Sequence, residues 1–375
     1  MTDTIILYTI TFKEGKMAKK KIFIWLGSAF AVSLAYLFIA AKPITSEFTL
    51  QKEWSINLDE KNPPNDEVAA NSDNLIPFFI GNRYGYIAPN GTLMAKKSIQ
   101  NNQLISITPK IVSVWNPIPD TLTIESAVPD QTITIKDPMG YPYLVDDRIF
   151  LIGKDQDSVA LINNGGNTEW SYAVGSPITA LDCRADRLLI GTLDGTIYLL
   201  SLKGELLFTF QPGGSRLSVI AGGALSSDGN YIAVISGIDR QRFILLEKAS
   251  QTYKVLHHQF LDSDFRRPVL VQFVQNNQYV LFEGKTNALV FDIHKRKIHE
   301  VPLNAPLLAI ETIAQSNLVF MLTGKDLQKQ LIVLRLPDRK LITAPFVSRE
   351  SFIYTAGNHI ILGSDSVIAS YLVGK

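Results

Sequence analysis

Five arginines in three short polar segments are the side chains of this chain best suited to hold a partner. The segments are Gly214–Arg216, Asp239–Arg242 and Asp264–Arg267, and the arginines are Arg216, Arg240, Arg242, Arg266 and Arg267. Arginine is enriched where proteins contact one another, because its planar guanidinium donates several hydrogen bonds and stacks on aromatic rings. The cluster therefore predicts a surface that binds a partner or a ligand. The alternative is a set of structural Arg–Asp pairs.

Residues for catalysis or metal binding form no recognisable pattern in the sequence. None of the five histidines belongs to an HExxH motif or to a pair with zinc-ligand spacing, and Asp155 and Asp157 lack the further carboxylates of a calcium loop. GxSxG, GxGxxG and GxxxxGK motifs are absent from the sequence. The single cysteine, Cys183, allows no disulfide within the chain. We therefore predict no catalytic residue, no cofactor and no metal site, and we interpret the chain as a non-enzyme.

The overall charge argues against nucleic acid as a partner. The chain has 375 residues, with 36 basic and 35 acidic residues and a net charge of +1. Nucleic-acid-binding proteins normally carry a basic excess or a basic stripe. Apolar residues make up 46% of the chain, which is enough to bury a large core.

An apolar segment near the N-terminus predicts a membrane anchor. Residues 22–41 contain no charged side chain and would span about 30 Å as a helix, the thickness of a hydrocarbon core. Lysines before the segment, with Lys19, Lys20 and Lys21 nearest, place residues 1–21 in the cytoplasm and residues 42–375 outside it. We expect a single-pass protein of the cytoplasmic (inner) membrane with a periplasmic domain. The alternatives are a cleaved signal peptide and a start at Met17 in place of Met1.

The remainder of the chain is predicted to be all-β, built from units like residues 186–210. In this unit three apolar runs are separated by Asp194-Gly195 and Lys203-Gly204, dipeptides suited to tight turns. An Asp or Asn followed by an apolar strand recurs about every 40–45 residues, which is typical of a β-propeller with four-stranded blades. The recurrences begin at Asp147, Asp186, Asn230, Asn277, Asn317 and Asn358.

Counting the weaker units before Asp147 predicts eight blades, with seven as the alternative. The last unit has only three strands before the chain ends, which would leave an open sheet edge. Residues 47–58 form a strand-like segment with no neighbour in the sequence to pair with. We therefore expect this segment to close the ring as the outer strand of the last blade.

The unit resembles the PQQ-like repeat of quinoprotein-type propellers. The resemblance lies in Asp194-Gly195-Thr196-Ile197-Tyr198-Leu199-Leu200 and in a glycine followed four residues later by an aromatic ring, as in Gly204 and Phe208 or Gly166 and Trp170. It implies that these rings, and Trp54 in the closing segment, dock one blade against the next. Enzymes of the family use a quinone with adjacent cysteines and calcium, and this chain has no cysteine pair. The resemblance is therefore to non-enzymatic members of the BamB type, and WD-repeat propellers share the period without the Trp-Asp ends.

The combined expectation is a membrane-anchored, extracytoplasmic propeller that acts as a protein-interaction scaffold in envelope assembly, with an unidentified protein partner. The rival interpretations are a hydrolase or lyase with its site in the central channel, and a ligand sensor that uses the arginines. An enzyme would carry acids and histidines on the innermost strands. These strands, predicted at residues 178–183, 219–225, 268–273 and 307–312, are mostly apolar, which favours the scaffold.

Overall fold

The computed structural model describes residue 25, residues 27–33, residue 36 and residues 48–60, 74–128 and 131–374. The described residues between 25 and 36 are helical. Most of the predicted anchor at 22–41 lies outside the described residues, as does residue 47 of the closing segment. Within the described part, no helix has both the length and the apolar character needed to cross a membrane.

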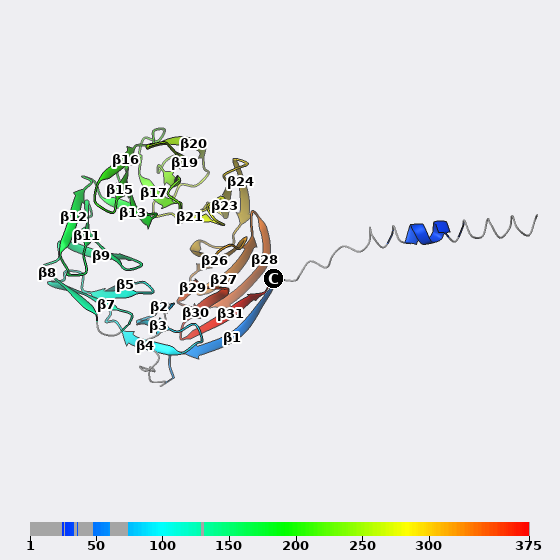
Figure 1. The fold of residues 1–375 in the computed structure, drawn as a ribbon, viewed down its shortest axis with the longest axis horizontal. Coiled ribbons are helices and arrows are strands. Elements are labelled where there is room, and N and C mark those ends of the chain that lie inside the picture. The colour runs from blue at the N-terminus through cyan, green and yellow to red at the C-terminus, as the bar shows by residue number, and fades with distance from the viewer. Residues whose placement is uncertain are drawn as a thin grey trace, which may run out of the picture. The chain divides into compact units, whose positions relative to one another are not determined.

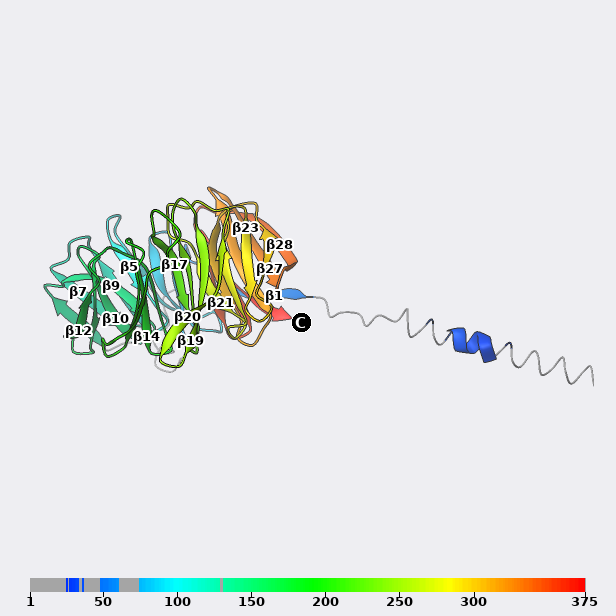
Figure 2. The same cartoon turned by 90° about the horizontal axis from the view of Figure 1, so that it is seen from above.

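Eight antiparallel β-sheets are arranged in a ring (Figure 1). This confirms the predicted eight-bladed propeller. Seven sheets have four strands, and the sheet β2–β3–β4 has three among the described residues. Seen edge-on, the strands run between the two faces of the ring (Figure 2).

The first four blades contain these strands, in chain order. Blade 1 is β2 (Ile76–Ile80), β3 (Arg83–Ile87) and β4 (Leu93–Ser98), and blade 2 is β5 (Leu104–Ile107), β6 (Ile111–Trp115), β7 (Thr121–Ser126) and β8 (Thr132–Lys136). Blade 3 is β9 (Gly140–Val145), β10 (Arg148–Gly153), β11 (Ser158–Ile162) and β12 (Thr168–Ala173), and blade 4 is β13 (Ile178–Arg184), β14 (Arg187–Thr192), β15 (Ile197–Ser201) and β16 (Leu206–Phe210).

The other four blades follow the same plan. Blade 5 is β17 (Ile220–Leu225), β18 (Tyr231–Ser236), β19 (Arg242–Ala249) and β20 (Thr252–Phe260), and blade 6 is β21 (Val271–Val274), β22 (Tyr279–Glu283), β23 (Asn287–Asp292) and β24 (Lys297–Pro302). Blade 7 is β25 (Leu307–Thr312), β26 (Leu318–Lys325), β27 (Gln328–Arg335) and β28 (Arg339–Val347), and blade 8 is β29 (Ser351–Ala356), β30 (His359–Ser364), β31 (Val367–Gly374) and β1 (Thr49–Asn57).

The core lies between neighbouring blades. The middle strands of most four-stranded blades are rich in buried apolar residues, because each face of such a sheet is covered by one of the two neighbouring blades. Between blades 5 and 6, for example, Phe243 stacks on Phe282 with ring centroids 4.5 Å apart. Phe291 also packs on the ring of Phe243. This packing makes the ring a firm support for its connecting loops.

The ring is closed by β1, which is the outermost strand of blade 8 and pairs with β31. The N–H of Leu58 donates to the carbonyl of Ser366 at 2.7 Å, so β1 ends where β31 begins and the two strands are antiparallel. The closing strand expected from the sequence is therefore present. It ties the start of the described propeller to its end and removes the open edge.

Two tryptophans dock one blade on the next in the same way. Trp54 of β1 donates from Nε1 to the carbonyl of Pro89 at 3.0 Å, and Trp170 of β12 donates to the carbonyl of Leu202 at 2.8 Å. Each indole ring lies against the glycine two residues after the carbonyl to which it donates, Gly91 for Trp54 and Gly204 for Trp170. A Cβ atom added to either glycine would lie 2.8 Å from the ring. Both glycines have positive φ, at 89° and 80°.

The comparison of these two contacts shows which strand blade 1 lacks. Gly204 lies in the turn between the third and fourth strands of blade 4, and Gly91 lies in the turn between β3 and β4. The strands β2, β3 and β4 therefore correspond to the second, third and fourth strands of the other blades. Within the described residues, blade 1 has no innermost strand.

Candidate functional site

The five arginines predicted from the sequence all lie on one face of the propeller. They belong to the connections between β16 and β17, β18 and β19, and β20 and β21, or to the first residue of β19. Connections from second to third strands and from fourth strands to the next blade emerge on the same side of a propeller, because successive strands are antiparallel. We call residues 211–219, 237–242 and 261–270 the arginine face. The start of β1 lies at the opposite face, since β1 is a fourth strand.

Arg267 is held within the protein. Its guanidinium makes two hydrogen bonds with Glu283, from Nη1 to Oε2 at 2.9 Å and from Nη2 to Oε1 at 2.8 Å. Glu283 is only 2% exposed and also accepts the N–H of Leu307 from blade 7 at 3.3 Å. The hydrogen bonds that Arg267 donates to Glu283 raise the pKa of Arg267. Arg267 is therefore part of a structural ion pair near the junction of blades 6 and 7, as in the alternative interpretation of the cluster.

Two further arginines are arranged around Phe260, whose ring is 40% exposed. The guanidinium carbon of Arg240 is 4.1 Å from the ring centroid and that of Arg242 is 5.7 Å away, both within cation–π range. Arg242 is half-buried, and its Nε has no hydrogen-bond partner in the described structure. The loop carrying Arg240 is tied to the neighbouring connection by the Ser215 hydroxyl, which donates to Asp239 and lowers the pKa of that exposed carboxyl.

Arg216, Arg240 and Arg266 are exposed and form no ion pair with any residue that the structure describes. Of these three, Arg266 lines a cavity of about 310 Å³, whose walls are mainly apolar side chains that include Ile178, Val219, Ile238, Phe265 and Pro268. Leu193 forms part of the cavity wall. Leu217 lies on the arginine face, and both leucines are 49% exposed. The arrangement offers unpaired positive charge next to an apolar hollow, which suits a ligand that is both acidic and apolar.

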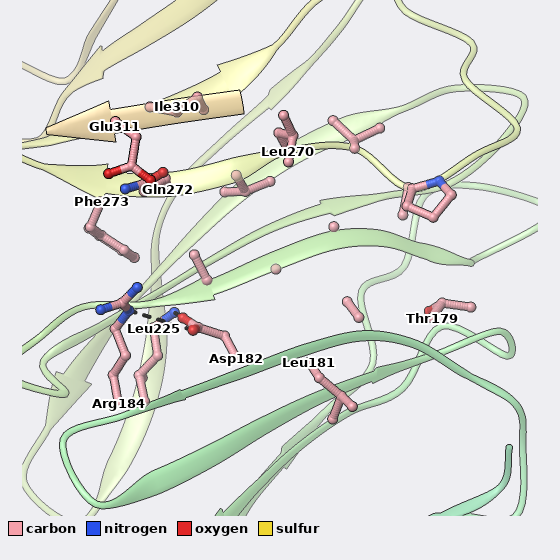
Figure 3. Close-up of a pocket in the computed structure, with 18 residues that line it drawn as sticks. Thr179, Leu181, Asp182, Arg184, Leu225, Leu270, Gln272, Phe273, Ile310 and Glu311 are labelled. Carbon is pink, nitrogen blue, oxygen red and sulfur yellow. Dashed lines mark hydrogen bonds and ion pairs between the residues drawn. The ribbon is translucent and has the colours of Figure 1, made fainter. Parts of the chain in front are cut away.

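A second cavity, of about 410 Å³, lies in the central channel between the innermost strands of blades 4 to 7 (Figure 3). Asp182 and Arg184 of β13 lie on one wall, and Glu311 of β25 and Gln272 of β21 lie on the other. Asp182 accepts the N–H of Leu225 at 2.7 Å and lies 3.5 Å from Nε of Arg184. Glu311 accepts the hydroxyl of Thr355 at 2.8 Å. The walls are otherwise mostly small and apolar.

Burial raises the pKa of both channel carboxyls, although their hydrogen bonds and Arg184 act in the opposite direction. Burial also raises the pKa of Tyr143, to about 12, and the charge of Asp182 contributes to that shift. Carboxyl groups whose pKa is shifted by burial are common in functional sites. Sequence reasoning did not select Asp182 or Glu311. The available signal was a single acid within an otherwise apolar innermost strand, in Leu181-Asp182-Cys183 and Ile310-Glu311-Thr312.

The histidines and carboxylates do not gather into a metal centre in the described parts of the chain, where no group of three or more potential ligands occurs. His257 instead packs between blades 5 and 6, with its ring 4.6 Å from that of Phe291. Burial lowers the pKa of His257. Cys183 is buried, and burial raises the pKa of its thiol to about 11, which leaves it an unreactive thiol.

The repeated blades and the closed ring agree with a family model described as "beta-propeller protein", which matches residues 16–374. The chain belongs to this beta-propeller family. A protein of Treponema pallidum (strain Nichols), described as uncharacterized, is 27% identical over 323 residues, which is 84% of each chain. This relative adds no function.

Solved structures of other propellers share the fold at low sequence identity. BamB from Moraxella catarrhalis is 14% identical with a TM-score of 0.58, and the match covers 86% of this chain and 100% of that one. The computationally designed protein Ika8 is also 14% identical with a TM-score of 0.59, covering 80% of this chain and 97% of that one. At such identities the likeness is one of fold alone.

Proposed function

We propose that this propeller is a membrane-anchored, extracytoplasmic scaffold that binds a protein partner through its arginine face. The observation that carries the proposal is that three exposed arginines without ion pairs lie on one face, where one of them, Arg266, lines an apolar cavity. Interfaces concentrate arginine and aromatic side chains around apolar pockets, and this face contains all three features. The loops rest on a closed ring, so little ordering is required when the partner binds.

The anchor, the location and the repeat type belong to the proposal. The apolar segment 22–41 and the lysines before it support a cytoplasmic-membrane anchor with the propeller in the periplasm. The docking of Trp54 on Gly91 and of Trp170 on Gly204 supports the PQQ-like repeat, because both contacts follow the pattern that the resemblance implies. The resemblance to non-enzymatic, membrane-attached propellers makes envelope assembly the process that we propose.

A non-enzymatic role is part of the proposal, and the central channel supports the main alternative. The raised pKa values of Asp182 and Glu311 in a cavity are features of ligand sites and of active sites. The channel nevertheless offers neither a histidine nor a nucleophile paired with a base among its lining residues. We therefore place the channel second to the arginine face.

Photocrosslinking in intact cells tests the proposed function. A photoreactive amino acid at position 217, on the arginine face, should capture a discrete protein partner. The matched control is position 203, an exposed lysine in the turn between β15 and β16 on the opposite face. Equal capture from both positions, or capture from position 203 alone, would contradict the arginine face as the binding surface. A reporter fused after Lys375 should be active outside the cytoplasm, and cytoplasmic activity would refute the proposed anchor orientation.

A further inference from the structure

The three unpaired arginines on this face differ from the other basic groups around them. Arg267 is neutralised by Glu283, and Lys285 lies 3.4 Å from Asp264. Arg216, Arg240 and Arg266 come from three successive loops and have no such partner among the described residues. Guanidinium groups without an acidic partner attract carboxylates, which they can bind through two parallel hydrogen bonds.

The cavity beside these arginines specifies a second property of the partner. Its lining residues Ile178, Val219, Ile238 and Phe265 belong to blades 4 and 5 and to the connection that enters blade 6, and Arg266 stands at its edge. A volume of about 310 Å³ suits one large apolar side chain. Because the cavity is apolar and its margin is cationic, the side chain that enters it must be flanked by acidic residues.

We infer that the arginine face binds an acidic polypeptide segment with one large apolar or aromatic anchor, the anchor entering the cavity and the flanking carboxylates pairing with Arg216, Arg240 and Arg266. This inference rests on the proposed function, since it specifies the partner of the same surface. Phe260 supports the arrangement by stacking with Arg240, whose guanidinium carbon is 4.1 Å from its ring centroid. The stacking limits the freedom of Arg240 and reduces the entropy lost when a carboxylate binds.

Fluorescence anisotropy with a defined probe tests the inference. The probe is a short fluorescein-labelled peptide of Asp and Glu residues with one central Phe, and the protein is the full-length chain in mild detergent. We expect a Kd below about 1 mM that weakens as salt is added, because screening acts on exposed charge pairs. Each of Arg216→Ala, Arg240→Ala and Arg266→Ala should weaken binding about two- to fivefold. The matched control is Arg339→Ala, an exposed arginine at the opposite face.

The anchor is tested by a cycle between peptide and protein. Replacing the central Phe of the peptide by Ser should weaken its binding to the natural chain. Leu193→Ser should weaken binding of the Phe peptide and leave binding of the Ser peptide unchanged. Leu193 is 49% exposed, so its replacement should leave the thermal unfolding midpoint unchanged. Equal losses for both peptides would show that the cavity does not hold the anchor and would overturn that part of the inference.

The remaining outcomes separate this inference from the proposed function. If crosslinking from position 217 captures a protein but acidic peptides fail to bind, the inference is wrong and the scaffold stands. If Arg339→Ala weakens the peptide as much as the three arginine variants do, the binding is non-specific and the inference is again wrong. Vesicles containing phosphatidylglycerol provide the last comparison. Flotation with vesicles that depends on the three arginines, without peptide binding, would assign the face to an anionic lipid surface instead.

Discussion

The arginine face and the central channel both carry charged side chains, but in opposite states. On the arginine face, the three unpaired guanidinium groups are exposed and remain charged at little cost. In the channel, Asp182 and Glu311 are largely buried, and burial raises the pKa of both. Charges at exposed loops are free to bind without affecting the fold, whereas charges in the channel oppose folding at neutral pH. The difference predicts which substitutions change stability and which change binding.

The largest effect acts on both regions at once, because both depend on a closed ring. Trp54→Ala removes the ring packed on Gly91 and the hydrogen bond to Pro89. We expect the free energy of unfolding to fall by about 3 kcal/mol, measured by chemical denaturation. Trp54→Phe is the control and should lose less, since it retains most of the packing. An unchanged denaturation midpoint for Trp54→Ala would show that blades 8 and 1 hold together without this contact.

The next effect separates Arg267 from the other arginines. Arg267→Ala leaves the buried carboxylate of Glu283 without its charged partner. We expect a loss of about 2 kcal/mol, reduced from the cost of a fully buried pair because the Arg267 side chain is 46% exposed. The double variant Arg267→Ala/Glu283→Gln should recover part of the loss. If Arg267→Ala unfolds at the same temperature as the natural chain, the ion pair does not stabilise the fold, and Arg267 belongs with the unpaired arginines.

A substitution in the channel should raise the stability of the protein, whereas the two substitutions above lower it. Because folding raises the pKa of Glu311, the folded state favours the protonated carboxyl. Protonation of Glu311 stabilises the folded state fully at a pH below the unfolded pKa of the group, about 4.3. This stabilisation is lost as the pH rises through the pKa of Glu311 in the folded state. Glu311→Gln should therefore stabilise the protein at pH 7, on the order of 1 kcal/mol. The gain should vanish near pH 4, and a gain that is constant with pH would contradict the role of ionisation.

His257 supplies a separate change in stability at acid pH. Folding lowers the pKa of His257 because its ring is buried between blades 5 and 6. The stability that its neutral form allows is present above the unfolded pKa, about 6.5, and is lost as pH falls toward the folded pKa. His257→Phe should remove this loss, which we expect to be below about 1 kcal/mol. Denaturation curves at pH 7.5 and pH 5 for both proteins would test it.

The smallest effect on stability is expected at the arginine face. Arg240→Ala and Arg266→Ala should each change the free energy of unfolding by less than about 0.5 kcal/mol, because neither side chain has a buried ionic partner. Both should still weaken partner capture from position 217. A loss of several degrees in the unfolding midpoint with capture intact would make these arginines structural pairs and would remove the contrast with Arg267.

The sequence by itself determined the propeller, its eight blades and its closing strand. These features depend on local patterns, such as the Asp194-Gly195 turn, the period of strands and an unpaired segment around Trp54. The turn and strand patterns recur along the chain, so a weak local signal is reinforced by its recurrence. The sequence also placed all five arginines at junctions between predicted strands, where four lie in loops and Arg242 begins β19.

Tertiary structure alone decided which of these charges are free. Arg266 and Arg267 are neighbours in the sequence, yet only Arg267 meets Glu283, because β22 ends beside the loop in which Arg267 lies. Asp182 and Glu311 lie far apart in the sequence and share a cavity because the ring brings the innermost strands of separate blades together. Burial and ionic pairing depend on such distant neighbours. The sequence of a single strand does not indicate which blade will lie opposite it across the channel.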